Sequence, residues 1–268
     1  MYKDFYVIDA HCHIYPEKIA SKAVAGTDNF YGVTSANKGT ISDLLERGDK
    51  TGVDHFIVQS VATTPKQVNS INEFISNSVA LYPDRFTGLG TLHPESEDIN
   101  GDIERLVELG LKGVKLHPDI QAFKLDDYRC LKIYEECEKR GLIMLLHTGD
   151  SRYDYSNPNR LLPLLKTYTN LTFIGAHFGG YSIWDEAAEK LCGIDNFYVD
   201  CSSSFPFIEK QQAKELIKRY TADKILFGTD YPMWDAVSEL DYFFSLGLDE
   251  CQIKSILSLN AKKVFNLE

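Results

Sequence analysis

Short apolar runs recur along the chain, and stretches with helical spacing of apolar and polar residues separate them. Eight of these runs have the length and the β-branched or aromatic content of strands. They are residues 5–10, 55–60, 85–92, 113–117, 142–147, 172–177, 197–202 and 224–230. Between them, segments such as 127–140 and 209–220 place apolar residues three and four positions apart, with charged residues on the other face. This alternation predicts repeated strand–helix units around a parallel sheet.

Eight such units predict a closed (β/α)8 barrel, the TIM-barrel fold, formed by one domain over residues 1–268. An open doubly wound sheet is the alternative, because periodicity does not reveal closure. Two segments do not fit the regular alternation of strands and helices. Residues 15–39 are longer than an ordinary strand–helix loop, and we expect this first loop to lie over the barrel mouth as a lid. Residues 248–268 predict one or two extra helices.

Composition narrows the classes of partner. The chain has 28 basic and 39 acidic side chains and a net charge of -11, which disfavours nucleic acid. No apolar stretch is long enough to cross a bilayer, and the first residues lack the basic region of a signal peptide. We therefore expect a cytoplasmic protein with a small-molecule substrate and no membrane partner. A homodimer is left open.

Polar side chains close several of the predicted strands, at the barrel end where reactive groups gather. His11 and His13 close the first run, and because side chains alternate along a strand, both imidazoles point one way while Cys12 points the other. Three later runs end in His147, His177 and Asp230. A divalent ion, with bonds of about 2 Å, would satisfy such a cluster in a dry cavity. Each histidine alone could equally have a structural role.

The segments IDAHCHIYP, LLHTGD, IGAHFGG and LFGTDYP resemble the metal motifs of the amidohydrolase superfamily. The likeness covers nearly the whole chain. It is strongest to the amidohydrolase-2 branch, which includes aminocarboxymuconate-semialdehyde decarboxylase and related hydrolases, hydratases and decarboxylases. The resemblance implies that one divalent ion is bound by His11, His13, His147 and Asp230, with His177 beside it as an acid or base. Zinc suits this ligand set best, with manganese, cobalt or ferrous iron as alternatives.

A bound ion lowers the pKa of its water from about 16 to near 7. Asp230 could accept that proton, and we expect His177 to titrate near neutrality and to polarise the substrate or relay the proton. We therefore put first the hydrolysis of a small ester, lactone or amide by metal-activated water. The alternative is non-oxidative decarboxylation or hydration of a small carboxylic acid, which the motifs do not distinguish. A barrel that binds a ligand without catalysis is a further alternative.

Further polar residues lie near the predicted mouth. Lys115 and His117 share one face of the fourth strand, and we expect an ion pair inside the barrel for Lys115 and a substrate contact for His117. A carbamylated Lys115 that bridges a second ion is the alternative. Arg152 and Trp234, in loops after their strands, are expected to contact substrate. Asp200 is expected to be a structural hydrogen-bond partner.

Overall fold

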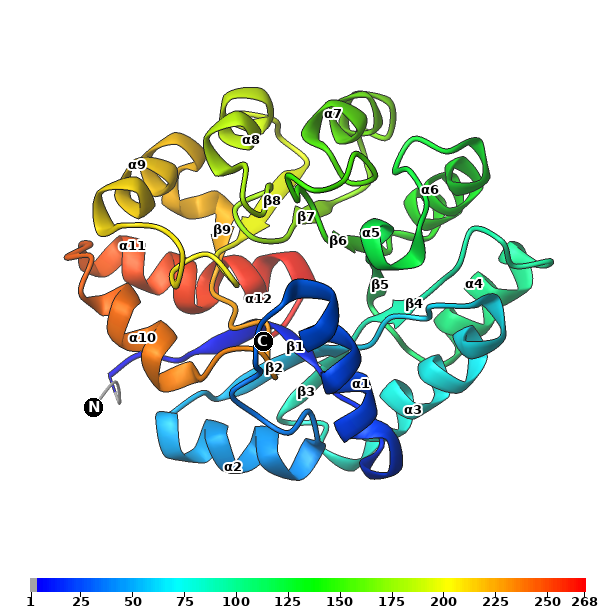
Figure 1. Ribbon diagram of the computed structural model, residues 1–268, viewed down its shortest axis with the longest axis horizontal. Helices are drawn as coiled ribbons and strands as arrows, with labels where there is room; N and C mark the ends of the chain where they lie inside the picture. Colours follow the sequence, from blue (N-terminus) through cyan, green and yellow to red (C-terminus); the bar gives the residue numbers. More distant parts are fainter. Residues whose placement is uncertain (1–3) are drawn as a thin grey trace.

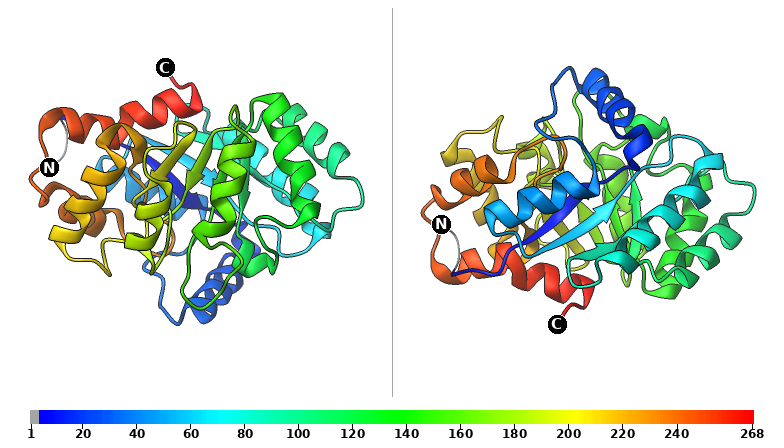
Figure 2. Two further views of the ribbon diagram at one scale, coloured as in Figure 1. Left: turned by 90° about the horizontal axis from the view of Figure 1, so that it is seen from above. Right: turned by 90° about the horizontal axis from the view of Figure 1, so that it is seen from below.

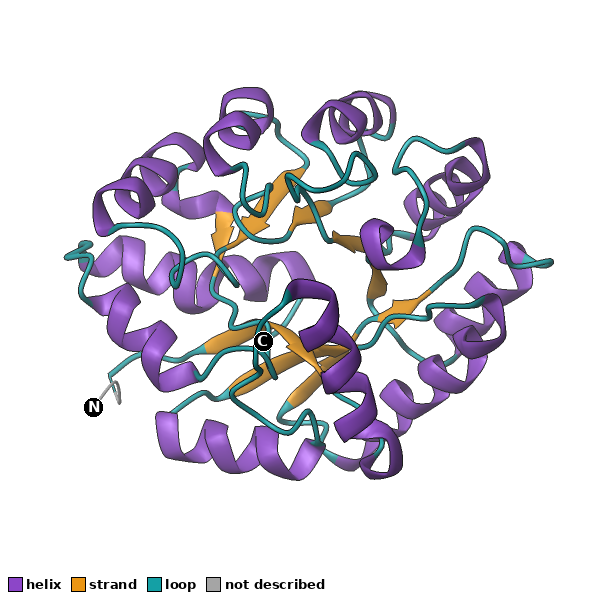
Figure 3. Ribbon diagram, viewed as in Figure 1, coloured by secondary structure: helices purple, strands orange, loops and turns teal. Residues whose placement is uncertain are grey.

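The computed structural model describes residues 4–268, in which a ring of parallel strands is surrounded by helices (Figures 1 and 3). All eight predicted runs contain strands, and the third is divided at Leu89 into two short ones. The strands are β1 (Ile8–His13), β2 (His55–Gln59), β3 (Phe86–Gly88), β4 (Gly90–Thr91), β5 (Gly113–Leu116), β6 (Ile143–Leu146), β7 (Phe173–Gly175), β8 (Phe197–Asp200) and β9 (Ile225–Leu226).

The continuous backbone at one joint and hydrogen bonds at the other close the ring. Strands β1-β2-β3 form one parallel sheet and β4 to β9 another, and the backbone continues from β3 to β4 through Leu89. At the other joint, the Ala10 amide donates to the Phe227 carbonyl at 2.8 Å, and Cys12 pairs with Tyr231 in a parallel bridge. The predicted TIM barrel is therefore confirmed, and the open sheet is excluded.

Helices cover the outside of the barrel, and the predicted helical segments 127–140 and 209–220 correspond to α6 and α9. The α-helices are α1 (Glu17–Tyr31), α2 (Ile41–Thr51), α3 (Val68–Leu81), α4 (Ile99–Glu108), α5 (Pro118–Gln121), α6 (Tyr128–Arg140), α7 (Pro158–Thr167), α8 (Trp184–Leu191), α9 (Lys210–Tyr220), α10 (Ala236–Phe244), α11 (Glu250–Lys254) and α12 (Asn260–Phe265). Short helical turns are η1 (Pro65–Gln67), η2 (Ala222–Lys224) and the π-helix η3 (Ser255–Leu259). Within residues 4–268 no helix is long and apolar enough to span a membrane.

The two segments outside the regular repeat lie at opposite ends of the barrel (Figure 2). The expected long first loop is mainly the helix α1, which lies at the mouth and buries only Ala20 fully among its residues. At the other end, α11, η3 and α12 follow one another without a break. Ala261 and Phe265 of α12 pack with Ile8 and Ile143 inside the barrel, so the C-terminal helix closes its base.

Candidate functional site

A cavity of about 620 Å³ opens at the carboxyl ends of the strands, with α1 as part of its wall. It contains most of the side chains that we expected at the site. The expected residues that line it are His11, His13, Lys115, His117, His147, His177 and Asp230. Among the described residues, Arg152 and Trp234 do not line it.

A bulge in β1 directs its two histidines into this cavity. Between Asp9 and Cys12, β1 has one residue more than the paired segment of β2. As a result Ile8 and Ala10 pack inside the barrel, while His11, the next residue, also faces inward and Cys12 packs outside. Asp9 holds the bulge, since its carboxylate accepts from the amides of His11 at 3.1 Å and Thr229 at 3.0 Å. Simple alternation along a strand therefore does not describe β1.

His11, His13 and Asp230 form one of three groups of potential metal ligands among the described residues. The Nε2 atoms of the two histidines are 3.2 Å apart, and Asp230 Oδ1 lies 3.2 Å from His11 Nε2 and 3.5 Å from His13 Nε2. Ligands bound at about 2.1 Å with tetrahedral or octahedral angles lie roughly 3.0–3.4 Å from one another. Two of the three distances lie in this range and the third, 3.5 Å, lies just above it, so the three atoms are close to the spacing that a single divalent ion requires.

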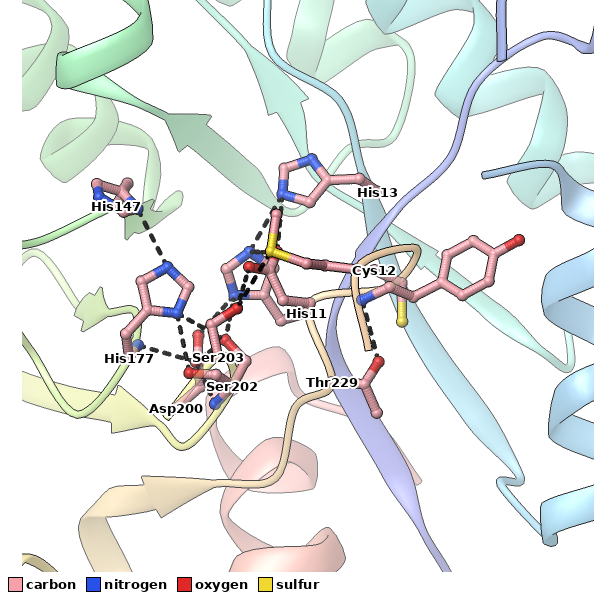
Figure 4. Close-up of polar contacts among 12 residues, drawn as sticks. His11, Cys12, His13, His147, His177, Asp200, Ser202, Ser203 and Thr229 are labelled. Carbon is pink, nitrogen blue, oxygen red and sulfur yellow. Dashed lines mark hydrogen bonds and ion pairs between the residues drawn. The ribbon is translucent and has the colours of Figure 1, made fainter. Parts of the chain in front are cut away.

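Asp200 orients His11 (Figure 4). Its Oδ2 lies 2.9 Å from His11 Nδ1, while its Oδ1 accepts from the amides of His177 and Ser202. A proton on Nδ1 that is donated to Asp200 leaves the lone pair on Nε2, the nitrogen that faces Asp230. Carboxylates fix metal-binding histidines in this way. Asp200 is thus the hydrogen-bond partner that we expected, and one of its partners is a candidate metal ligand.

A second chain of hydrogen bonds positions Asp230. The Trp234 indole donates to Ser203 Oγ at 2.8 Å, and that hydroxyl donates to Asp230 Oδ2 at 2.6 Å. Oδ1 is thereby left for the two histidines. The backbone of Asp230 has φ 58°, a left-handed conformation that side-chain-bearing residues seldom adopt without support from their surroundings. Trp234, expected to contact substrate, here acts on Asp230 through Ser203, and its substrate contact stays a prediction.

His147 lies next to this group and not within it. Its Nδ1 is 3.1 Å from His177 Nε2, and its Nε2 is 3.3 Å from Asp119 Oδ2. Figure 4 shows His147 on the far side of His177 from His11. The ligand role that the family motif implies for His147 stays a prediction, and it requires this imidazole to approach the other three residues.

Two neighbours of His147 had no signal in the sequence. The hydroxyl of Tyr31, from α1, lies 2.7 Å from His117 Nε2 and 3.5 Å from His147 Nε2. Asp119, two residues after His117, has its other oxygen buried without a partner among the described residues. Tyr31 lies in the segment expected to be a loop. It is 86 positions from His117 in the sequence, so only the folded structure reveals their contact.

Lys115 is fully buried beside the candidate ligands. Its Nζ lies 3.1 Å from His11 Nε2. Burial lowers its pKa to about 8, and the charges of Asp230 and Asp200 oppose this effect. The amine therefore carries a positive charge in most molecules at neutral pH. The ion pair expected for Lys115 stays a prediction, and its bridging role stays an alternative.

Burial favours the neutral form of the His13, His147 and His177 imidazoles, whereas Asp230 stays charged. Burial lowers the pKa of His13 and His147 well below the ordinary value, and that of His177 to about 4. Burial alone would raise the pKa of Asp230, but the imidazoles that face it hold that pKa below the ordinary range. Neutral imidazoles and an ionised carboxylate are the forms that bind a cation. Without metal, His177 does not titrate near neutrality, which corrects our expectation.

Arg152 is engaged with protein groups. Its guanidinium donates to Asp150 Oδ2 at 2.7 Å and to the Phe30 carbonyl at 2.7 Å, and it lies 5.0 Å from the centre of the Phe30 ring. These contacts attach the end of α1 to the loop after β6. The expected contact of Arg152 with substrate stays a prediction.

Comparison with known proteins places this geometry in context. The family model described as Amidohydrolase matches residues 8–267. Over 142 residues the chain is 30% identical to 2-amino-3-carboxymuconate-6-semialdehyde decarboxylase of Dictyostelium discoideum. That alignment covers 51% of this chain and 38% of the relative, so the match spans well under half of the curated protein.

Three solved structures share the fold over nearly the whole chain. A TIM-barrel protein from Bordetella bronchiseptica has a TM-score of 0.81 at 18% identity and covers 98% of this chain and 99% of its own. The 5-carboxyvanillate decarboxylase of Sphingomonas paucimobilis has a TM-score of 0.75 at 16% identity, with 98% and 100% covered. A dihydroxybenzoic acid decarboxylase from Polaromonas, with bound manganese and 2-nitroresorcinol, has a TM-score of 0.73 at 21% identity, with 98% and 97% covered. At these identities the likeness establishes the fold alone.

Proposed function

We propose that this chain, which belongs to the amidohydrolase family, is a metal-dependent decarboxylase of a small carboxylic acid. The observation that carries the proposal is the group of His11, His13 and Asp230, with the spacing of metal ligands, inside one cavity. The matched relative and two of the similar structures are named as decarboxylases. Hydrolysis, the reaction we put first from the motifs, has less support from these relatives.

The residues fit a divalent ion held by His11, His13 and Asp230, with His147 as the further ligand that the motif implies. Such an ion would supply positive charge that stabilises negative charge developing on the substrate. Zinc remains our first candidate from the ligand types. Manganese is the second, because it is the ion bound in the Polaromonas structure.

The neighbouring side chains supply the remaining requirements of the reaction. Decarboxylation breaks the bond to the carboxyl carbon, leaves the electron pair on the substrate skeleton, and requires a proton there. The ammonium group of Lys115 would attract the substrate carboxylate into the cavity. His177 Nδ1 lies 3.0 Å from the Ser202 carbonyl and carries the proton of the neutral imidazole. Nε2, which lies 3.1 Å from His147 Nδ1, would accept a proton from solvent and then deliver it to the substrate carbon. We assign this proton transfer to His177, with Asp230 as the second catalytic residue.

The test is release of carbon dioxide by protein loaded with manganese or zinc, using dihydroxybenzoates and muconate-like acids. We expect release that a chelator abolishes and that Asp230→Asn lowers about 10²–10⁴-fold. Asp249→Asn, at an exposed helix cap, is the matched control and should keep full activity. Turnover of lactones, esters or amides without any release of carbon dioxide would reject decarboxylation in favour of hydrolysis.

A further inference from the structure

The cavity extends well beyond the candidate metal centre. Its inner end holds the histidines, Lys115 and Asp230, whereas its outer part runs between α1 and the beginning of α3. Apolar side chains face this outer part from both helices and from the loop after β2. They are Ile19, Ala23, Val61, Ile71 and Phe74. The metal centre and this outer part form one continuous space.

One face of α1 lines the cavity along its length. Ile19, Ala23, Thr27 and Tyr31 follow one another at intervals of four residues, so they lie on the same side of the helix. Tyr31 reaches the inner end, where its hydroxyl contacts His117. Ile19 lies at the outer end and is 49% exposed. A molecule bound along this face would therefore extend from the metal centre toward solvent.

The outer part offers apolar contact and little charge. Among the described lining residues it carries one charged side chain, the exposed Lys22, and no arginine. A second carboxylate far from the metal centre would thus find few partners. Apolar side chains left partly exposed on facing walls gain free energy when a ligand covers them. The cavity volume of about 620 Å³ is in the range of sites for ligands larger than a single-ring acid.

We propose that the substrate is an acid with an apolar tail, which binds between α1 and α3 while its carboxylate lies at the metal centre. This inference rests on the proposed function for the position of the carboxylate. The tail site itself is defined by Ile19, Ala23, Ile71 and Phe74. It predicts that affinity increases with the length of the tail.

The probes are 5-alkylresorcinols from methyl to heptyl, titrated calorimetrically into manganese-loaded protein. They correspond to decarboxylated products, so binding is measured without turnover. Burial of each additional methylene should raise the affinity about two- to fourfold. Ile19→Asp should abolish this dependence on length and leave the affinity for the methyl compound within about twofold. Val107→Asp is the matched control, because Val107 is 44% exposed on a helix away from the cavity, and it should retain the full dependence.

Equal affinity across the series, absence of binding by every member, or an identical length dependence in Ile19→Asp would overturn the tail site. A separate assay for carbon dioxide distinguishes the two proposals. If affinity rises with length but no acid releases carbon dioxide, decarboxylation fails and the tail site stands. If dihydroxybenzoates release carbon dioxide while affinity is independent of length, the tail site fails and decarboxylation stands.

Discussion

At the scale of single residues, the candidate site depends on carboxylates with different tasks. Asp230 faces the two β1 histidines, whereas Asp200 lies behind His11 and fixes which of its nitrogens is free. Burial would raise the pKa of Asp200, but the imidazoles of His11 and His177 and several hydrogen bonds hold it below the ordinary range. Asp200 is therefore ionised near neutral pH.

Asp200→Asn should weaken metal binding about 10- to 100-fold, because the neutral amide no longer makes His11 a strong ligand. The affinity can be measured by competition with a chromophoric chelator, using zinc and manganese. Asp185→Asn, an exposed position on α8, should bind metal as the unaltered protein does. Unchanged affinity in Asp200→Asn would show that His11 is not a ligand or needs no orientation.

At the scale of elements, the sequence predicted the barrel because its strands and helices have distinct periodicities. The motifs also marked His11, His13, His177 and Asp230, each at the end of a predicted strand, and the structure places them around one cavity. The bulge in β1 was not predictable, since it depends on pairing with β2. The helix α1 was missed because most of its side chains stay partly exposed, so it lacks a long apolar stripe.

Helix α10 contains a buried carboxyl group that makes stability depend on pH. Burial raises the pKa of Glu239 to about 8, from 4.5 in an unfolded chain. Below pH 4.5 both states hold the proton, and the group does not change stability. As the pH rises toward 8, the unfolded chain releases the proton while the folded protein retains it, so the free energy of unfolding falls.

Glu239→Gln should remove the part of the decrease in unfolding free energy that ionisation of Glu239 causes as the pH rises. Between about pH 5 and pH 8 the variant should lose roughly 1–3 kcal/mol less stability than the unaltered protein. Urea unfolding at the two pH values gives the comparison, and Glu97→Gln, an exposed position, serves as the control. Parallel pH profiles for the unaltered protein and Glu239→Gln would contradict the buried, protonated state of Glu239.

At the scale of the whole molecule, the candidate ligands lie on both sides of the joint that closes the barrel. His11 and His13 belong to β1, and Asp230 follows β9, with the joint bonds between Ala10 and Phe227 nearby. An ion held by these three residues would connect the first strand to the last. Metal binding should therefore stabilise the entire fold and not merely a loop.

Manganese or zinc at about 100 times its dissociation constant should stabilise the protein by roughly 2.7 kcal/mol, which raises Tm by about 5–10 °C for a chain of this size. Differential scanning calorimetry with and without a chelator measures the change. His13→Ala should lose most of the increase, whereas the exposed Asp249→Asn should retain it. An equal Tm with and without metal would rule out an ion at this joint.

The additional residue in β1 separates two tasks within one strand. Positions before it fill the interior of the barrel, and positions after it carry chemistry, although both sets face the same axis. Substitutions of the apolar residues Ile8 and Ala10 would thus change the stability of the barrel and leave the candidate ligands in place. Conversely, deletion of one residue from this strand would turn the imidazoles of His11 and His13 away from the axis, although the sequence would still contain every candidate ligand. The candidate site therefore depends on the number of residues in β1 as well as on their types.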